Sequence, residues 1–311
     1  MRTRLAPTPS GFLHLGNAAN FVLCWLLARC RGGTVVLRIE DTDTARRRTD
    51  FVESLFRDLE WLGLDWDEGP SGPGDDRGEW FQSSPLRQER YREVFESWCR
   101  EGLLFPCRCT RRELSLAAPQ VARLDEVEGI GPLYPGTCRE RTAQEAGPSD
   151  AWRLRLPDVP SRFEDLWRGR QELSNLGSLG NPVLRRGDGC FAYHLAVCMD
   201  DADQGITQVV RGRDLLPWAH LHGHLHSLLG KAAPVFGHHP LLGGSAGERL
   251  AKSAGSTSLH SLREAGVSRE AVLGRLVPFL HPGRERVPSI SLEELRAVGI
   301  PDPGCTDLPL A

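Results

Sequence analysis

The sequence predicts an α/β protein built on a doubly wound parallel sheet. Within residues 1–62, short apolar segments rich in β-branched side chains alternate with amphipathic segments in the order strand, helix, strand, helix. This order is typical of parallel strands joined by crossover helices. The 311 residues suggest about two domains, and the 40% hydrophobic and 25% charged content is ordinary for a globular protein.

The first elements follow from their apolar periodicity. Phe21, Trp25 and Ala28 recur at helical spacing, after a short apolar segment that prolines end. A β-branched run then indicates a buried strand, and two later segments carry apolar residues on one helical face. We therefore expect strands over 3–6 and 34–39, and helices over 17–29, 50–62 and 86–101.

The pattern changes in the middle of the chain. Pro, Arg and Glu dominate residues 107–161 and periodicity is weak there, which predicts an inserted module between two halves of the core, 1–106 and 162–245. The tail after Pro301 has no usable pattern, within a short helical C-terminal region over 246–311. Later apolar runs predict strands over 191–197, 206–210 and 234–237, and helices over 215–229 and 268–279.

Lysine is rare in this chain. Only Lys231 and Lys252 are lysines among 38 basic residues, and Lys252 lies in a Gly/Ser-rich stretch. An arginine-biased sequence should keep lysine mainly where a compact ammonium is needed, although a chance surface residue is the alternative.

A phosphate loop is predicted between the first strand and the first helix. Gly11 and Gly16 allow a ligand to approach the backbone closely, and the helix that begins near Gly16 offers free N–H groups to phosphate. His14 adds a donor just before that helix. The alternative is a tight turn with a capped histidine.

An acidic run, Glu40 to Asp43, follows the second strand. Carboxylates at this end of a strand are placed to bind an amino group, a ribose or a metal-bound phosphate, and Glu40 is the best candidate. The alternative is a capping run before the helix at Asp50.

The nine cysteines are an odd number and unevenly spaced, which favours reduced thiols over a disulfide framework. A metal site is suggested by Cys107, Cys109 and Cys138, because zinc takes four ligands in a closed structural site. Tyr134 and Cys99 are the alternatives for the fourth ligand. For the four alternating histidines over 220–226, a solvated or interface helix is preferred to a second metal site.

Charge and hydropathy exclude some classes. The net charge of -3 gives no global basic field, although arginines cluster locally. The longest apolar run, 21–28, is far shorter than the ~20 residues of a membrane span, so we expect a cytoplasmic protein that binds no membrane.

In combination, these motifs resemble those of class I aminoacyl-tRNA synthetases of the glutamyl type. Residues 4–17 resemble the first signature and 249–253 the second, while 193–201 and 210–215 are similar to segments of the amino-acid pocket. Asn17 and Arg249 depart from the pattern, standing where the signatures usually have histidine and lysine.

The resemblance implies a Rossmann-like catalytic core and a role for each matching residue. It implies that His14 and Lys252 are catalytic and that Mg²⁺ accompanies ATP. It assigns ATP binding to His14, Gly16, Asn17, Arg249, Lys252 and Ser253, and glutamate binding to Arg4, Ala6, Thr8, Glu40, Tyr193 and Arg211.

Two features resemble one branch, the short glutamyl-Q tRNA(Asp) synthetases. Few residues follow Ser253, so no anticodon-binding domain is expected, and in that branch the residues matching Cys107, Cys109, Tyr134 and Cys138 bind one zinc ion. The branch implies a monomer that transfers glutamate to queuosine in the anticodon of tRNA(Asp). The alternatives are a truncated glutamyl-tRNA synthetase that charges the tRNA 3′ end, an inactive zinc-bearing RNA-binding paralogue, and another nucleotidyltransferase that activates a small carboxylic acid.

Overall fold

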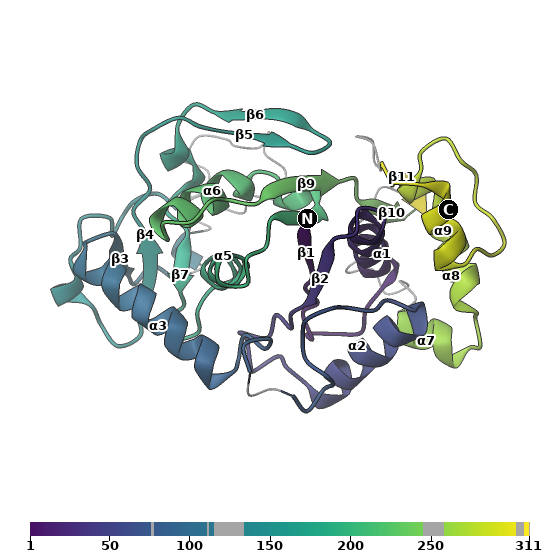
Figure 1. Cartoon of the computed structure of the whole chain (residues 1–311). Helices are drawn as coiled ribbons and strands as arrows, with labels where there is room; N and C mark the ends of the chain where they lie inside the picture. Colours follow the sequence, from purple (N-terminus) through teal and green to yellow (C-terminus); the bar gives the residue numbers. More distant parts are fainter. Residues whose placement is uncertain (76–77, 111, 115–133, 245–257, 303–307, 311) are drawn as a thin grey trace.

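A computed structural model describes residues 1–75, 78–110, 112–114, 134–244, 258–302 and 308–310. Its centre is a set of parallel strands (Figure 1). Strand β1 (Arg2–Leu5) pairs with β2 (Thr34–Leu37), and β8 (Gln208–Gly212) pairs with β9 (Val235–His239). The two pairs lie side by side through β1 and β8, where the Thr207 amide donates to the Arg2 carbonyl over 2.9 Å. The predicted α/β class is therefore confirmed.

The far edge of this sheet is mixed. Strand β5 (Ser161–Asp165) joins β9 in parallel and pairs antiparallel with β6 (Gly169–Leu173). These two strands form the hairpin at the top of Figure 1. Antiparallel edge strands are common on otherwise parallel sheets.

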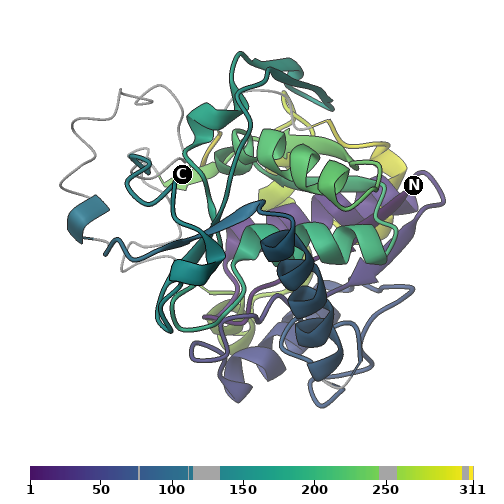
Figure 2. The ribbon, with the colours of Figure 1, turned by 90° about the vertical axis from the view of Figure 1, so that its left-hand side faces the viewer.

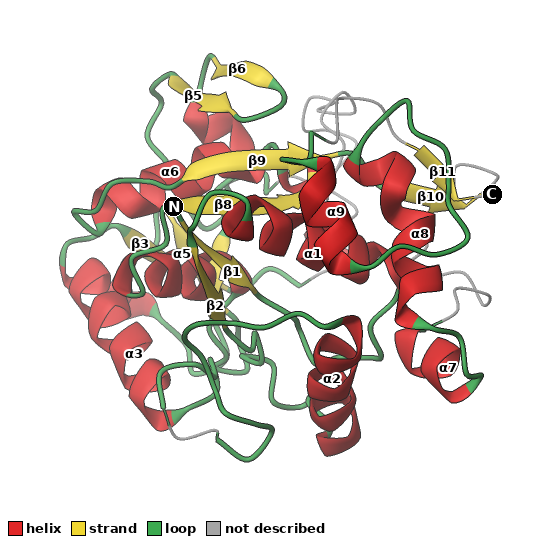
Figure 3. Cartoon of the chain, turned by 45° about the vertical axis from the view of Figure 1, so that its right-hand side comes forward, coloured by secondary structure: helices red, strands yellow, loops and turns green. Residues whose placement is uncertain are grey.

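Helices cover both faces of the parallel strands, as a doubly wound sheet requires (Figure 3). On one face, α1 (Leu15–Arg29) packs against β1, β2 and β8. On the other face lie α5 (Tyr193–Asp203) and α6 (Trp218–Leu228), in contact with each other. Helix α1 is apolar on almost every side because α8 (Arg269–Leu280) and α9 (Leu292–Val298) enclose its outer face.

The C-terminal part of the chain returns to the first half. Helix α7 (Leu259–Glu264) packs against α2 (Thr49–Leu62), and Arg263 bonds Asp58 over 2.9 Å across this contact. Strands β10 (Leu242–Gly244) and β11 (Leu308–Leu310) pair in parallel. The sequence predicted no strand after Pro301, because β11 has only three residues and the middle one is a proline.

A second core lies beside α5. Helix α3 (Pro85–Arg100) leads into β3 (Leu104–Cys107), which forms an antiparallel sheet with β4 (Ala151–Leu154) and β7 (Val183–Arg185). Figure 2 shows α3, α5 and α6 from this side. The described residues also form short 3₁₀ turns, η2 (Ala143–Glu145), η3 (Leu176–Leu179) and η4 (Arg213–Leu215).

Two predictions were wrong. Residues 191–197 were expected to form a strand, but Tyr193 begins helix α5. A short apolar run enclosed on all sides has the same pattern in a buried strand and in a buried helix. The histidine-rich helix was expected to be solvated or to lie at an interface, yet His220, His222 and His226 are buried within the chain. Internal hydrogen-bond partners make the burial of His220 and His222 possible.

The eight described cysteines are free thiols. Among the described residues, no helix is both long enough and apolar enough to cross a membrane.

A buried ionic network joins α5 to α3 and the sheet. Asp200 is fully buried and accepts hydrogen bonds from Tyr91 and Gln82, each at 2.7 Å. Its other partners are guanidinium groups, those of Arg87 at 2.5 Å and Arg38 at 3.6 Å. Removing one member of such a network leaves a buried charge without compensation.

We therefore predict that Asp200→Ala lowers the free energy of unfolding by about 3–5 kcal/mol. The matched control is Asp203→Ala on the same helix, where the carboxylate is 24% exposed and pairs with Arg87. This control should cost at most about 1 kcal/mol. Urea denaturation measures both, and equal losses would contradict the buried network.

Candidate active site

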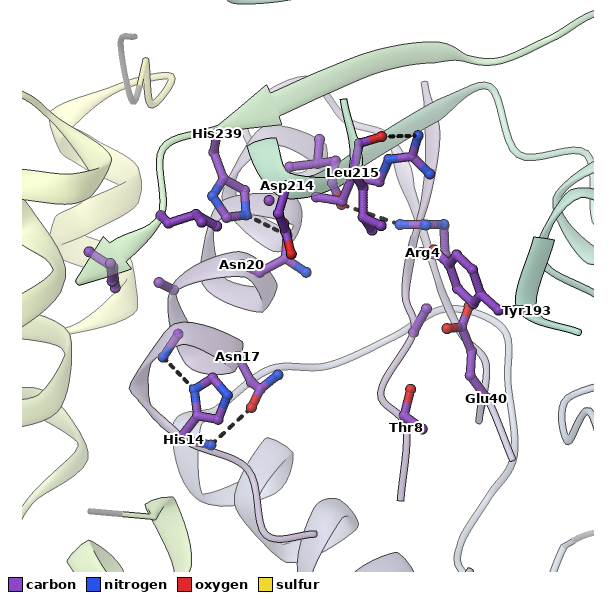
Figure 4. Close-up of a pocket in the computed structure, with 18 residues that line it drawn as sticks. Arg4, Thr8, His14, Asn17, Asn20, Glu40, Tyr193, Asp214, Leu215 and His239 are labelled. Atoms are coloured by element: carbon purple, nitrogen blue, oxygen red, sulfur yellow. Dashed lines mark hydrogen bonds between the residues drawn. The ribbon is translucent and has the colours of Figure 1, made fainter. Parts of the chain in front are cut away.

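One cavity of about 380 Å³ opens at the carboxyl ends of β1 and β8, beside the start of α1. This is the position expected for a ligand in an open α/β sheet. The cavity is lined by all nine of the predicted ATP and glutamate residues that the structure describes, namely Arg4, Ala6, Thr8, His14, Gly16, Asn17, Glu40, Tyr193 and Arg211. Figure 4 shows His14 and Asn17 on one side of the cavity, and Arg4, Thr8, Glu40 and Tyr193 on the other.

His14 forms the N-cap of α1 at the first side. Its Nδ1 accepts from the Gly16 amide over 3.1 Å, while the His14 amide donates to Asn17 Oδ1 over 3.0 Å. Burial lowers the pKa of His14, so the ring is neutral at pH 7 and carries its proton on Nε2. A Cβ added at Gly16 would lie 2.9 Å from the His14 ring, so another residue there would displace the ring from its capping position. The cap thus fixes an imidazole donor beside free backbone N–H groups, an arrangement suited to phosphate.

Ion pairs organise the opposite side. Arg4 Nε contacts Asp201 at 3.2 Å, and Arg38 contacts both Asp201 at 2.8 Å and Glu40 at 3.1 Å. Burial and the Glu40 carboxylate raise the pKa of Tyr193 to about 12, so its hydroxyl remains protonated. The phenol and the carboxylate thus present polar groups to the cavity, and the buried Arg38 guanidinium holds Glu40 in place.

Arg211 differs from these two arginines. It is 4% exposed, and its hydrogen bonds go to His238 at 2.9 Å, His222 at 2.7 Å and the Leu215 carbonyl at 3.2 Å. No carboxylate in the described part of the chain lies at ion-pair distance from Arg211, and burial lowers its pKa. A guanidinium keeps its charge even so. The cavity therefore contains a buried positive charge that a ligand carboxylate can neutralise.

Sequence reasoning missed several residues of this site. Asn20, Asp214 and His239 also line the cavity, and His239 Nε2 bonds Asn20 Oδ1 over 3.1 Å. His239 is the last residue of β9, so the rule that ligands bind at the carboxyl ends of strands would have identified it. Asp201 lies at the end of the segment 193–201 that resembles the amino-acid pocket, but no local pattern reveals its pairing with Arg4, which is far away in the sequence.

Three predicted ATP-binding residues, Arg249, Lys252 and Ser253, lie outside the described residues. Their relation to the cavity stays a prediction.

The predicted metal ligands come together in the structure. The thiols of Cys107, Cys109 and Cys138 all lie within 4.8 Å of one another. The Tyr134 hydroxyl accepts from the Cys138 amide over 2.5 Å and is within hydrogen-bonding reach of the Cys107 and Cys138 thiols. Cys99, the alternative fourth ligand, lies on α3 and packs against a different core. Three thiols and a phenol at one point are a donor set that fits zinc.

Comparison with known proteins agrees with this geometry. The family described as tRNA synthetases class I (E and Q), catalytic domain, matches residues 1–286. A glutamyl-Q tRNA(Asp) synthetase from Symbiobacterium thermophilum is 47% identical over 88% of this chain and 84% of that protein. A glutamate–tRNA ligase from Geobacter sulfurreducens is 39% identical over 89% of this chain, which spans 56% of the ligase.

Solved structures agree as well. The crystal structure of a glutamate tRNA ligase from Elizabethkingia meningosepticum superposes with a TM-score of 0.73 at 26% identity, over 95% of this chain and 64% of the ligase. The chain therefore belongs to the class I tRNA synthetases for glutamate and glutamine, as an enzyme with the catalytic domain of that family, and it is similar to the glutamyl-Q tRNA(Asp) synthetases.

Proposed function

We propose that this enzyme activates L-glutamate with ATP as glutamyl-adenylate and transfers the glutamyl group to queuosine in the anticodon of tRNA(Asp). The observation that carries the first half is the cavity itself, in which a helix end suited to phosphate faces a buried guanidinium that pairs with no carboxylate among the described residues. The transfer to queuosine is supported by sequence identity. This identity is 47% to a glutamyl-Q tRNA(Asp) synthetase but 39% to a glutamate–tRNA ligase.

In the first step, an oxygen of the glutamate α-carboxylate attacks the α-phosphorus of ATP. The bond from this phosphorus to the bridging oxygen breaks, and pyrophosphate leaves. Such a reaction needs in-line positioning and compensation of phosphate charge more than it needs a strong base. His14 and the amide groups at the start of α1 would contact the phosphates, and Mg²⁺ brought by the nucleotide would neutralise part of their charge.

The opposite side of the cavity would hold the amino acid. The α-carboxylate must be free to react, so Arg211 would pair with the side-chain carboxylate, which suits a planar fork of N–H donors. Glu40, with Tyr193 beside it, would receive the ammonium group. Arg4, Ala6 and Thr8 would form the adjoining wall, as the family resemblance implies.

In the second step, a hydroxyl of the queuosine cyclopentenediol would attack the carbonyl carbon of the adenylate. An ester forms, AMP leaves, and the hydroxyl proton passes to solvent. The free energy for ester formation comes from the phosphoanhydride bond of ATP that breaks in the first step.

Radiolabelled glutamate tests both steps. We expect glutamate-dependent ATP–pyrophosphate exchange without RNA, followed by transfer of label to queuosine-containing tRNA(Asp). The label should map to the anticodon fragment after nuclease digestion, because that fragment carries the modified base. Equal label on queuosine-free tRNA(Glu), at its 3′ end, would instead identify a glutamate–tRNA ligase, and absence of exchange would identify an inactive paralogue.

A pair of substitutions at His14 separates its two roles. His14→Asn retains a side-chain oxygen that can cap α1, whereas His14→Ala removes the cap at a cost of about 1 kcal/mol of stability. Both variants lose the imidazole donor, so both should lower kcat for pyrophosphate exchange by about a hundredfold. Full activity in His14→Asn would show that His14 is only a helix cap.

We further propose that Cys107, Cys109, Tyr134 and Cys138 bind one structural zinc ion. The three clustered thiols and the adjacent phenol support this assignment, and the position of Cys99 on α3 argues against that residue as the fourth ligand. Zinc would fix the segment after β3 to the segment that leads into β4.

Elemental analysis of the purified protein tests the zinc site. We expect one zinc per chain in the wild type and none in Cys138→Ser, since three ligands do not close the site. Tyr134→Phe should weaken zinc binding by at least about tenfold in a chelator competition. Cys99→Ser is the matched thiol control and should retain its zinc; loss of zinc from that variant would exclude Tyr134 as the fourth ligand.

A further inference from the structure

A continuous chain of hydrogen bonds surrounds Arg211, the charged group on β8 that faces the cavity. On one side, Arg211 Nε contacts His238 Nε2 at 2.9 Å, and His238 Nδ1 contacts Asp165 Oδ2 at 2.5 Å. On the other side, Arg211 contacts His222 Nδ1 at 2.7 Å, and His222 Nε2 contacts His194 Nδ1 at 2.9 Å. The partners come from four different elements, β5, β9, α5 and α6, so the whole fold contributes to this arrangement.

The direction of every bond in this chain follows from Arg211. A guanidinium has donors only, so the contacting nitrogens of His222 and His238 must be acceptors. Each ring then carries its proton on the other nitrogen. His238 therefore donates from Nδ1 to Asp165, and His222 donates from Nε2 to His194.

These rings are also uncharged. Burial, with the nearby Arg211 charge, lowers the pKa of His194 to about 3 and the pKa of His222 well below its ordinary value. Burial likewise lowers the pKa of His238 to about 4, despite the hydrogen bond to Asp165. Asp165 accepts hydrogen bonds from the backbone amides of residues 167, 168 and 238. The His238 ring separates its carboxylate from the Arg211 guanidinium.

Arg4 and Arg38 differ from Arg211 because their partners include carboxylates. Both are buried near the same cavity, and both contact the carboxylate of Asp201, at 3.2 and 2.8 Å. Their charges are compensated within the protein. Arg211 is held as firmly, but its side-chain partners in the described chain are neutral acceptors that fix its orientation without neutralising its charge.

The bonds also leave room for a substrate. A guanidinium has five N–H groups, and His238, His222 and the Leu215 carbonyl occupy one each on the three nitrogens of Arg211. In the described structure, one N–H on each terminal nitrogen remains. These two donors are available to the two oxygens of a carboxylate.

We propose that His222 and His238 are positioning residues that hold Arg211 through neutral acceptors, so that its charge is reserved for the side-chain carboxylate of glutamate and glutamine is rejected. The inference rests on the proposed function and extends it to the choice of amino acid. A buried cation gains more from a full negative charge than from the dipole of an amide, and a neutral ligand would leave that cation uncompensated. A protein carboxylate in place of either histidine would remove this preference.

Matched substitutions at His222 test the proposal by pyrophosphate exchange. His222→Asn places an amide oxygen near the position of Nδ1, and His222→Asp differs from it by one charge. Relative to His222→Asn, His222→Asp should raise KM for glutamate by about tenfold or more and lower the preference in kcat/KM for glutamate over glutamine. KM for ATP should remain within about twofold, because the phosphate side is untouched.

His220 supplies the control. It lies on the same helix but bonds Ser161 at 2.9 Å, so His220→Asn and His220→Asp should not differ in KM for glutamate. The proposal is overturned if the two His222 variants have the same KM for glutamate and the same selectivity. It is also overturned if KM for ATP rises in parallel with KM for glutamate in His222→Asp, because that result indicates general damage to the fold.

Nitrogen NMR of histidine-labelled protein tests the arrangement without any substrate. At pH 7 we expect His222 to be protonated only on Nε2 and His238 only on Nδ1, with signals assigned from the spectra of His222→Asn and His238→Asn. An imidazolium or the opposite tautomer at either ring would overturn the proposal. If the wild type shows no glutamate-dependent exchange, the proposed function fails, and these tautomers still decide whether the neutral acceptors are present.

Discussion

Balancing buried guanidinium charge is the constraint on which this active site depends. Arg4 on β1, Arg38 after β2 and Arg211 on β8 converge because β1 pairs with β2 and lies beside β8. Asp201 pairs with the first two, and Glu40 and Asp200 supply further negative charge to Arg38. The place of Asp201 on α5 makes that helix part of the site. For the third, the described chain supplies hydrogen bonds but no counter-charge. Other interactions of the fold offset the free-energy cost of burying Arg211, and its charge is available to a ligand.

Much of the architecture could be predicted from local patterns. The apolar periodicity of residues 17–29, 50–62 and 86–101 identified α1, α2 and α3, because each helix buries at least one apolar face. The glycines and His14 identified the phosphate loop, since a side chain at position 16 would push the His14 ring out of its capping position. The spacing of three cysteines indicated a cluster that the structure confirms.

What the sequence left undetermined depends on tertiary contacts. A buried apolar run such as 193–199 has no exposed face, so its periodicity carries no information about helix or strand. The four alternating histidines suggested a polar surface, because nothing local reveals that Arg211 lies against one of them and Ser161 against another. The roles of Asp201 and His238 were missed for the same reason: their partners are distant in the sequence.

Histidine in this fold therefore serves two different purposes through one property, the ability of a neutral ring to accept at one nitrogen and donate at the other. His14 accepts from the backbone and keeps its donor beside the cavity, whereas His222 and His238 accept from Arg211 and pass their donors into the protein. The most direct test of the central claim is a crystal structure with L-glutamate bound. We expect the side-chain carboxylate to lie on the two remaining N–H groups of Arg211. Glutamate bound with its α-carboxylate on Arg211, or bound outside this cavity, would contradict the account.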